Sequence, residues 1–217
     1  MIAGVDEAGR GPVLGPLVVA GVAVESDVPL RQLNVRDSKK LTPDRREALA
    51  PEIEKVARFE LVVVPAERID VMRAEMSLND FEAKIFAQVI EALRPETAYV
   101  DAADVDEIEF KRSVVRELSF HVEIVSKHNA DELFPVVSAA SILAKVRRDR
   151  EMRLIEEELG IRVGSGYPAD PETIGFLENW IKVNGTLPPH TRTSWDTARR
   201  LLAESRIRKL DEFGGMP

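Results

Sequence analysis

The sequence predicts an α/β fold, with a mixed five-stranded sheet that carries one antiparallel strand, flanking helices and a helical C-terminal appendage. Apolar strand-like runs alternate with segments of helical spacing, which is typical of a layered α/β domain. Only a few residues separate the first two runs, residues 2–6 and 13–24, so they must pair as an antiparallel hairpin. Strand patterns stop beyond Gly160. We expect one domain, residues 1–217, of which residues 164–217 form the appendage.

Short runs rich in Val, Ile and Leu predict the remaining strands of the sheet. They occupy residues 59–64, 97–100 and 120–125, and Asp101 directly follows the second of them. Residues 30–40 are polar and basic and are predicted to be a loop.

Capping residues and the spacing of apolar side chains predict the helices. Thr42 and Pro43 are an N-cap and a first helical residue, and this helix should run to about Val56. Ser77 caps a second helix that Pro95 ends. The other predicted helices cover residues 106–118, 131–159, 171–183 and 194–206.

The composition excludes some classes of protein and leaves others open. There is no cysteine, which excludes a disulfide framework and a thiolate zinc site. We find no secretion signal and no apolar run long enough to span a bilayer, so we expect no membrane association and a place in the cytoplasm. The net charge of −8 does not favour nucleic-acid binding, although a local basic face can act within an acidic protein. A monomer is the default expectation.

Acidic residues at strand ends are the strongest chemical signal in the sequence. Asp6 and Asp101 each stand at the carboxyl end of a predicted strand, where ligands gather in open α/β sheets. Asp131 begins a helix after another strand and should lie along the same edge; its alternative role is a helix N-cap. Converging carboxylates make an oxygen-only site that suits Mg²⁺ or Mn²⁺. Glu7 presents a problem because neighbouring strand residues point to opposite faces, so either the strand breaks there or the backbone carbonyl of Glu7 serves the metal.

Three further segments offer contacts for a phosphate or a sugar, and a fourth favours close packing. The turn Gly9-Arg10-Gly11 allows close backbone approach and adds a guanidinium, and its alternative is a hairpin with a surface salt bridge. Lys39 and Lys40 could hold a phosphate, or could belong to a solvated loop. The other two segments are Ser138–Ser141, whose small residues favour close packing, and the loop 164–171, which displays Tyr167 either for stacking on a sugar or base or for packing under its own loop.

Taken together, six motifs resemble ribonuclease HII, and more closely its archaeal branch. They occur in the order found in that family and cover the chain from residue 1 to about 200. The motifs are Gly4-Val-Asp6-Glu7-Ala-Gly9-Arg10-Gly11, Asp37-Ser38-Lys39-Lys40-Leu41, Tyr99-Val-Asp101, Lys127-His-Asn-Ala-Asp131-Glu, Ser138-Ala-Ala-Ser141-Ile-Leu-Ala-Lys145 and Gly164-Ser-Gly166-Tyr167-Pro-Ala-Asp170-Pro171. Ribonuclease HIII, a near relative, has an extra N-terminal domain and usually a lysine between the glycines of the turn, where this sequence has Arg10.

The resemblance implies a ribonuclease H-like fold and a metal-dependent endoribonuclease. Its expected substrates are RNA–DNA hybrids and duplex DNA with single embedded ribonucleotides. It would cut 5′ of the ribonucleotide to leave a 3′-hydroxyl and a 5′-phosphate, removing misincorporated ribonucleotides and RNA primers. Two divalent ions, Mn²⁺ or Mg²⁺, would assist catalysis.

The resemblance also implies the roles of individual residues. Metal ligation and catalysis fall to four acids, and substrate contact to the turn, the two lysines and the tyrosine. The implied acids are Asp6, Glu7, Asp101 and Asp131, and the implied substrate contacts are Gly9, Arg10, Gly11, Lys39, Lys40 and Tyr167.

The end of the chain, Lys209-Leu210-Asp211-Glu212-Phe213, is similar to a degenerate box that binds PCNA-like sliding clamps. Leu210 and Phe213 would make that contact, although Gly214 stands where a second aromatic residue is usual; the alternative is a disordered acidic tail. Two other functions compete with the endoribonuclease hypothesis. One is a structure-specific DNA nuclease of the same fold, and the other is a non-catalytic clamp-binding scaffold.

Overall fold

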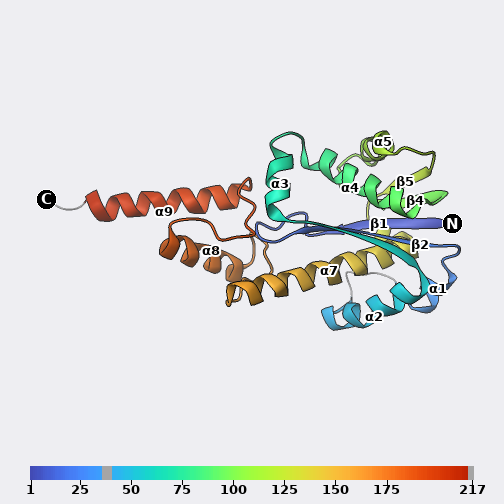
Figure 1. Ribbon diagram of the computed structural model, residues 1–217, viewed down its shortest axis with the longest axis horizontal. Coiled ribbons are helices and arrows are strands. Elements are labelled where there is room, and N and C mark those ends of the chain that lie inside the picture. Colours follow the sequence, from blue (N-terminus) through green and yellow to red (C-terminus); the bar gives the residue numbers. More distant parts are fainter. Residues whose placement is uncertain (36–40, 215–217) are drawn as a thin grey trace. The chain divides into compact units, whose positions relative to one another are not determined.

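The computed structural model describes the backbone of residues 1–35 and 41–214, and side chains within these ranges as far as residue 207. The chain forms two compact units (Figure 1). The sheet unit comprises Met1–Ala8, Leu17–Val63 and Glu75–Asp149. The helical unit comprises Gly9–Pro16, Val64–Ala74 and Arg150–Pro217. The expectation of a single domain stays a prediction.

In the described part of the chain, five strands form one mixed sheet in the order β3-β2-β1-β4-β5. The central strand β1 (Ile2–Ala8) pairs antiparallel with β2 (Leu17–Val24) and parallel with β4 (Thr97–Asp101). β5 (Glu123–Lys127) pairs parallel with β4, and β3 (Arg58–Val64) lies beyond β2. This confirms the predicted sheet, and it gives β1 two neighbours whose side chains can meet its own.

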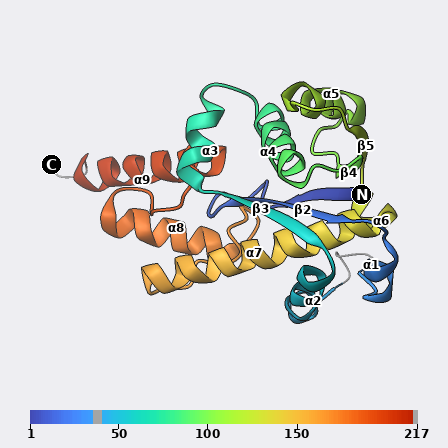
Figure 2. The ribbon, with the colours of Figure 1, turned by 45° about the vertical axis from the view of Figure 1, so that its right-hand side comes forward.

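Helices cover both faces of the sheet (Figure 2). On one face lie α4 (Leu78–Leu93) and α5 (Glu107–Glu117), and Phe86 of α4 meets Phe110 of α5 edge to face at 5.2 Å between ring centroids. Ser77 caps α4 as predicted, because its hydroxyl accepts a hydrogen bond from Asp80 N–H at 3.1 Å. On this face α4 packs against β1 and β2, and α5 packs against β5.

The opposite face packs against α2 (Pro43–Val56) and the first half of α7 (Pro135–Leu159). Thr42 caps α2, as the sequence predicts. α7 approaches β1 so closely that a Cβ at Gly4 would fall inside the backbone of Val136 and Val137. Glycine at this position therefore sets the distance between the helix and the central strand.

The structure corrects the predicted elements in three places. Residues 30–40 are not all loop, because α1 (Val28–Gln32) forms with a proline in its first turn. α3 (Ala66–Arg73) follows Pro65 and was not predicted. The predicted helix 131–159 is two helices, α6 (Ala130–Leu133) and α7, because Phe134 precedes Pro135 and is extended (φ −122°, ψ 119°).

The helical unit has its own apolar core, formed by the end of α7 with α8 (Pro171–Asn184) and α9 (Asp196–Gly214). Its buried members are Val13, Leu14, Met152, Ile155, Val163, Phe176, Leu177, Ile181, Ala198 and Leu201. Val13 and Leu14 come from the segment between β1 and β2, so this part of the hairpin belongs to the second core. Among the described residues, no helix has the length and apolar character needed to cross a bilayer.

Candidate active site

Two of the predicted acids come together on adjacent parallel strands. Val5 of β1 pairs with Val100 of β4, so Asp6 and Asp101 are each the next residue on neighbouring strands. Residues in register on parallel neighbouring strands point to the same face of the sheet, so these two carboxylates project from the same face at neighbouring positions. Asp6 is 5% exposed.

The surroundings of Asp6 oppose its ionisation. Burial, followed by the negative charge of Asp101, raises the pKa of Asp6 to about 7. A hydrogen bond from the Ser141 hydroxyl and the positive charge of Lys145 act in the opposite direction without cancelling these effects. A buried carboxylate beside a like charge is expensive to keep ionised unless a cation joins it, so the site has the electrostatic character of a cation site.

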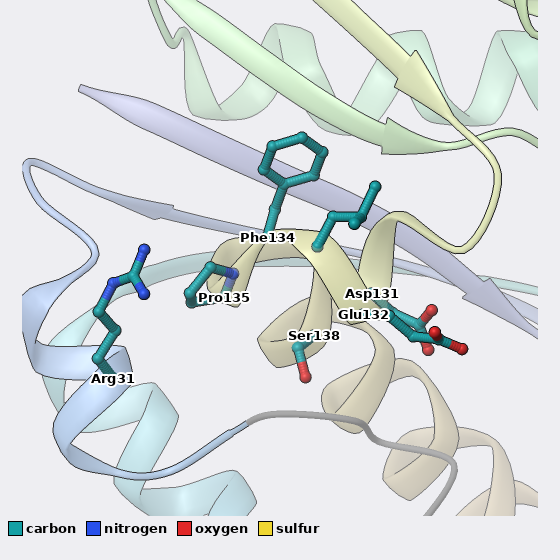
Figure 3. A pocket seen from close by; sticks show the side chains of 7 residues that line it. Arg31, Asp131, Glu132, Phe134, Pro135 and Ser138 are labelled. Atoms are coloured by element: carbon teal, nitrogen blue, oxygen red, sulfur yellow. The ribbon is translucent and has the colours of Figure 1, made fainter.

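Asp131 adjoins this pair through the backbone. The Asp101 carboxylate accepts a hydrogen bond from Ala130 N–H at 3.0 Å, which ties β4 to the start of α6. Asp131 is the next residue and is 2% exposed. It contributes to a pocket at the α6–α7 junction, where Figure 3 shows the Asp131 and Glu132 side chains away from Arg31 of α1.

Glu7 does not join the pair in the way that the sequence suggests. β1 continues through Glu7 to Ala8, so the alternative in which the strand breaks at Glu7 is wrong. The side chains of Asp6 and Glu7 therefore leave the sheet on opposite faces. Among the described residues, no group of three or more His, Cys, Asp or Glu side chains is arranged to hold a metal ion. The structure thus brings Asp6 and Asp101 together and places Asp131 beside them, without closing a four-acid cluster.

The turn Gly9-Arg10-Gly11 lies next to Tyr167 in the helical unit. A Cβ built on Gly11 would stand 3.6 Å from Cε1 of the Tyr167 ring. Gly9 has φ +88°, a backbone conformation that disfavours a side chain. The tyrosine is 42% exposed, so its ring is displayed rather than packed under its own loop.

Hydrogen bonds hold the tyrosine loop against the segment that follows the turn. The Gly166 carbonyl accepts from the N–H groups of Val13 (2.8 Å) and Leu14 (3.2 Å). Asp170 fixes the loop from within, because its carboxylate accepts from Ser165 N–H and Oγ, both at 2.6 Å. These bonds from Ser165, with a further one from Glu172 N–H, lower the pKa of Asp170 to about 2, so this carboxylate is ionised at any ordinary pH.

Several polar residues of these two regions were missed by sequence reasoning. Ser141 and Lys145 lie one turn apart on α7 and are hydrogen-bonded at 2.9 Å, and both act on Asp6. The small residues 138–141 suggested close packing, and all four are buried. The signal available for a role at Asp6 was the i, i+4 spacing of a hydroxyl and an ammonium. Arg192, which contacts the turn, gave no local signal because its partners are more than 170 positions away.

Four predicted residues cannot be placed. Lys39 and Lys40 lie outside the described residues. α9 extends past the predicted end at residue 206 and its backbone includes Leu210 and Phe213, but their side chains also lie outside what the structure describes.

Comparison with known proteins supports the resemblance over nearly the whole chain. The family model of Ribonuclease HII matches residues 3–198. A Ribonuclease HII of Thermococcus kodakarensis is 48% identical over 225 aligned positions, which cover 98% of this chain and 97% of that protein. The crystal structure of the ribonuclease H2 from Pyrococcus horikoshii OT3 has a TM-score of 0.88 at 39% identity, covering 94% of this chain and 98% of that one.

A further solved structure is the PCNA:RNase HII complex from Archaeoglobus fulgidus, with a TM-score of 0.86 at 44% identity. The match covers 93% of this chain and 96% of that chain. These findings confirm the prediction of ribonuclease HII made from the six motifs. The protein is an endoribonuclease of the ribonuclease H type 2 class, and the chain belongs to the ribonuclease HII family.

Proposed function

We propose that the protein hydrolyses the phosphodiester 5′ of a ribonucleotide, in RNA–DNA hybrids and at single ribonucleotides embedded in duplex DNA. The observation that carries this proposal is the pairing of two elements of different chemistry. Asp6 is buried and feels the like charge of Asp101. A turn that lies beside an exposed tyrosine begins three positions after Asp6 in the sequence. The first element suits metal-assisted hydrolysis and the second suits recognition of a sugar.

The acids fit a hard divalent cation. Their donor atoms are carboxylate oxygens, which Mg²⁺ and Mn²⁺ prefer. Burial and the charge of Asp101 raise the pKa of Asp6, and a bound cation would stabilise its ionised form. Asp6 and Asp101 would hold the metal, with Asp131 as a further ligand and Glu7 serving it through its backbone carbonyl, the alternative that a continuous β1 leaves. Two such ions would supply an activated water and would stabilise the leaving 3′-oxygen. Ser141 would keep the Asp6 carboxylate in place by the hydrogen bond that it donates.

Recognition of the ribonucleotide would fall to the turn and the tyrosine. The backbone of Gly9-Arg10-Gly11 can approach the 2′-hydroxyl, the group that distinguishes RNA from DNA. Tyr167 would stack on the sugar at the RNA–DNA junction, and its exposure leaves the ring accessible for this contact. Lys39 and Lys40 would contact substrate phosphates.

The test of this function is cleavage of an end-labelled duplex that contains one ribonucleotide, with Mg²⁺, with Mn²⁺ and with EDTA. We expect a single cut 5′ of the ribonucleotide with a divalent ion, no cut in EDTA, and no cut of the matched all-DNA duplex. A preference for an all-DNA junction over the embedded ribonucleotide would instead favour a structure-specific DNA nuclease. Absence of any cut by folded protein would refute the nuclease proposal and favour a scaffold.

A second proposal concerns a partner. The Archaeoglobus fulgidus relative, 44% identical, forms a complex with PCNA, and the end of this chain carries the degenerate box around Leu210 and Phe213. We propose that this segment binds a PCNA-like sliding clamp.

The clamp proposal predicts that removing both apolar side chains abolishes most of the affinity. Buried apolar anchors dominate small interfaces, so Leu210→Ala with Phe213→Ala should weaken binding to an archaeal clamp at least about tenfold by surface plasmon resonance. Glu212→Gln, within the same segment, is the matched control and should bind as the unmodified protein does. Equal binding by the double variant would place the contact elsewhere or remove it.

A further inference from the structure

The side chain of Arg192 donates hydrogen bonds to the backbone of the turn. It is the largest fully buried side chain among the described residues, at 1% exposed. Its guanidinium donates to the carbonyls of Gly9 (2.5 Å), Arg10 (2.8 Å) and Gly15 (3.0 Å). A planar guanidinium offers several donors in fixed directions, so three carbonyls bound to one such group are fixed relative to one another. Arg192 thus sets the path of the backbone on both sides of Gly11.

The backbone around Arg192 reinforces this arrangement. Arg192 N–H donates to the Val13 carbonyl at 2.8 Å, and Gly15 N–H donates to the His190 carbonyl at 2.9 Å. Trp195 donates from its indole N–H to the Gly11 carbonyl at 3.3 Å. The guanidinium groups of Arg73 and Arg192 lie over its ring, at 4.8 Å and 4.9 Å from the ring centroid.

Asp70 of α3 fixes the two residues between Arg192 and Trp195. One carboxylate oxygen accepts from Thr193 N–H and Oγ1, both at 2.7 Å, and the other from Ser194 N–H (3.0 Å) and Oγ (2.6 Å). Burial raises the pKa of Asp70, but these hydrogen bonds outweigh burial and leave the pKa below its ordinary value. Four bonds to an ionised carboxylate hold this short segment firmly.

We infer that Asp70 is a positioning residue for recognition of the ribonucleotide, acting through Arg192 and Trp195 on the Gly9-Arg10-Gly11 turn. The Asp70 carboxylate holds the backbone of Thr193 and Ser194 by hydrogen bonds. The position of this backbone determines the direction in which the side chains of the flanking residues, Arg192 and Trp195, leave it. Those side chains then hold the carbonyls of the turn. This inference rests on the proposed role of the turn in contacting the 2′-hydroxyl. Loss of Asp70 loosens the turn, and a displacement of about 1 Å in a positioning element can reduce rates by roughly a hundredfold.

The alternative is that Asp70 only anchors the start of α9. An anchor of that kind changes stability and the fraction of folded enzyme, and it leaves the preference for ribose unchanged. The experiment therefore compares Asp70→Asn with Glu67→Gln, an exposed residue of the same helix, since both remove one negative charge from α3. Asparagine retains one acceptor oxygen, so about half of the hydrogen bonds to the segment are lost.

Two readouts are needed, at a temperature where circular dichroism shows each variant folded. The first is the KM for a duplex with one ribonucleotide, divided by the inhibition constant of the all-DNA duplex. We expect this ratio to rise about tenfold in Asp70→Asn and to stay constant in Glu67→Gln. The second is amide hydrogen exchange of a peptide covering residues 9–15, which should be faster in Asp70→Asn alone.

The outcomes separate this inference from the proposed function. Unchanged exchange over residues 9–15 in folded Asp70→Asn overturns the positioning role, whether or not the protein cleaves. Faster exchange with an unchanged ratio overturns the link to recognition. Failure of the unmodified protein to cleave the ribonucleotide duplex overturns the proposed function instead, and the exchange measurement still decides whether Asp70 holds the turn. Arg192→Lys, which keeps the charge but loses the fork of donors, should reproduce the effect, and its combination with Asp70→Asn should be less than additive.

Discussion

Replacement of Asp6 by asparagine should lower kcat by at least about a thousandfold while leaving the fold intact. Residues that contact the ligands of a metal typically contribute about 10–100-fold to affinity or activity, and loss of a residue proposed to bind the metal itself should exceed that. The free energy of unfolding should stay constant or increase, because asparagine removes a buried charge and its repulsion with Asp101 while preserving the shape of the side chain. Single-turnover cleavage of the ribonucleotide duplex and thermal unfolding measure the two effects.

The control for this variant is Glu54→Gln, which removes one charge from an exposed position of α2 in the same unit. It should cleave and unfold like the unmodified protein. If Asp6→Asn retained turnover, Asp6 would have no metal role. If it lost turnover together with much of its stability, the loss could be assigned to unfolding and the carboxylate would require a different test.

Replacement of Gly4 by alanine should reduce the free energy of unfolding by about 3 kcal/mol, at the upper end of what overpacking usually causes. The added methyl group would enter the backbone of Val136 and Val137, and backbone atoms cannot turn aside as a flexible side chain can. α7 or β1 must therefore move. For a chain of this size, the melting temperature should fall by roughly 6–12 °C.

A matched glycine makes this prediction specific. Gly175 lies within α8, and a Cβ built there meets nothing within 4 Å. Gly175→Ala should stabilise the protein by roughly 0.5–1 kcal/mol, because alanine favours the helix and restricts the unfolded chain. Opposite signs for the two substitutions would support the close approach of α7 to β1, and a neutral Gly4→Ala would contradict it.

The sequence predicted the sheet well because its signals are local. The opening hairpin requires antiparallel pairing, and the helices with clear caps at Thr42 and Ser77 begin where expected. The missed elements are short or depend on packing. α3 has no side-chain cap hydrogen bond, and α1 is five residues long. The division between α6 and α7 could have been predicted, since the residue before a proline disfavours helical backbone.

The candidate site was predicted only in part, for a different reason. The proximity of Asp6 and Asp101 could be predicted, because each stands at the end of a strand and the order of strands in the sheet makes the two strands neighbours. The direction of the Glu7 side chain depends on how far β1 continues, and apolar spacing does not determine this to one residue. Asp70 and Arg192 contact segments remote in sequence, so their roles require the folded chain.

The distance along the chain between Arg192 and the turn has a consequence for synthesis of the protein. Arg192 donates to the Gly9 carbonyl across 183 positions and to the Gly15 carbonyl across 177. While Arg192 has not yet emerged from the ribosome, the growing chain contains the turn sequence but lacks the guanidinium that binds the carbonyls of the turn. The segment made first is therefore completed almost last, so a nascent or prematurely terminated polypeptide that ends before residue 192 carries the acids of the sheet without a formed turn.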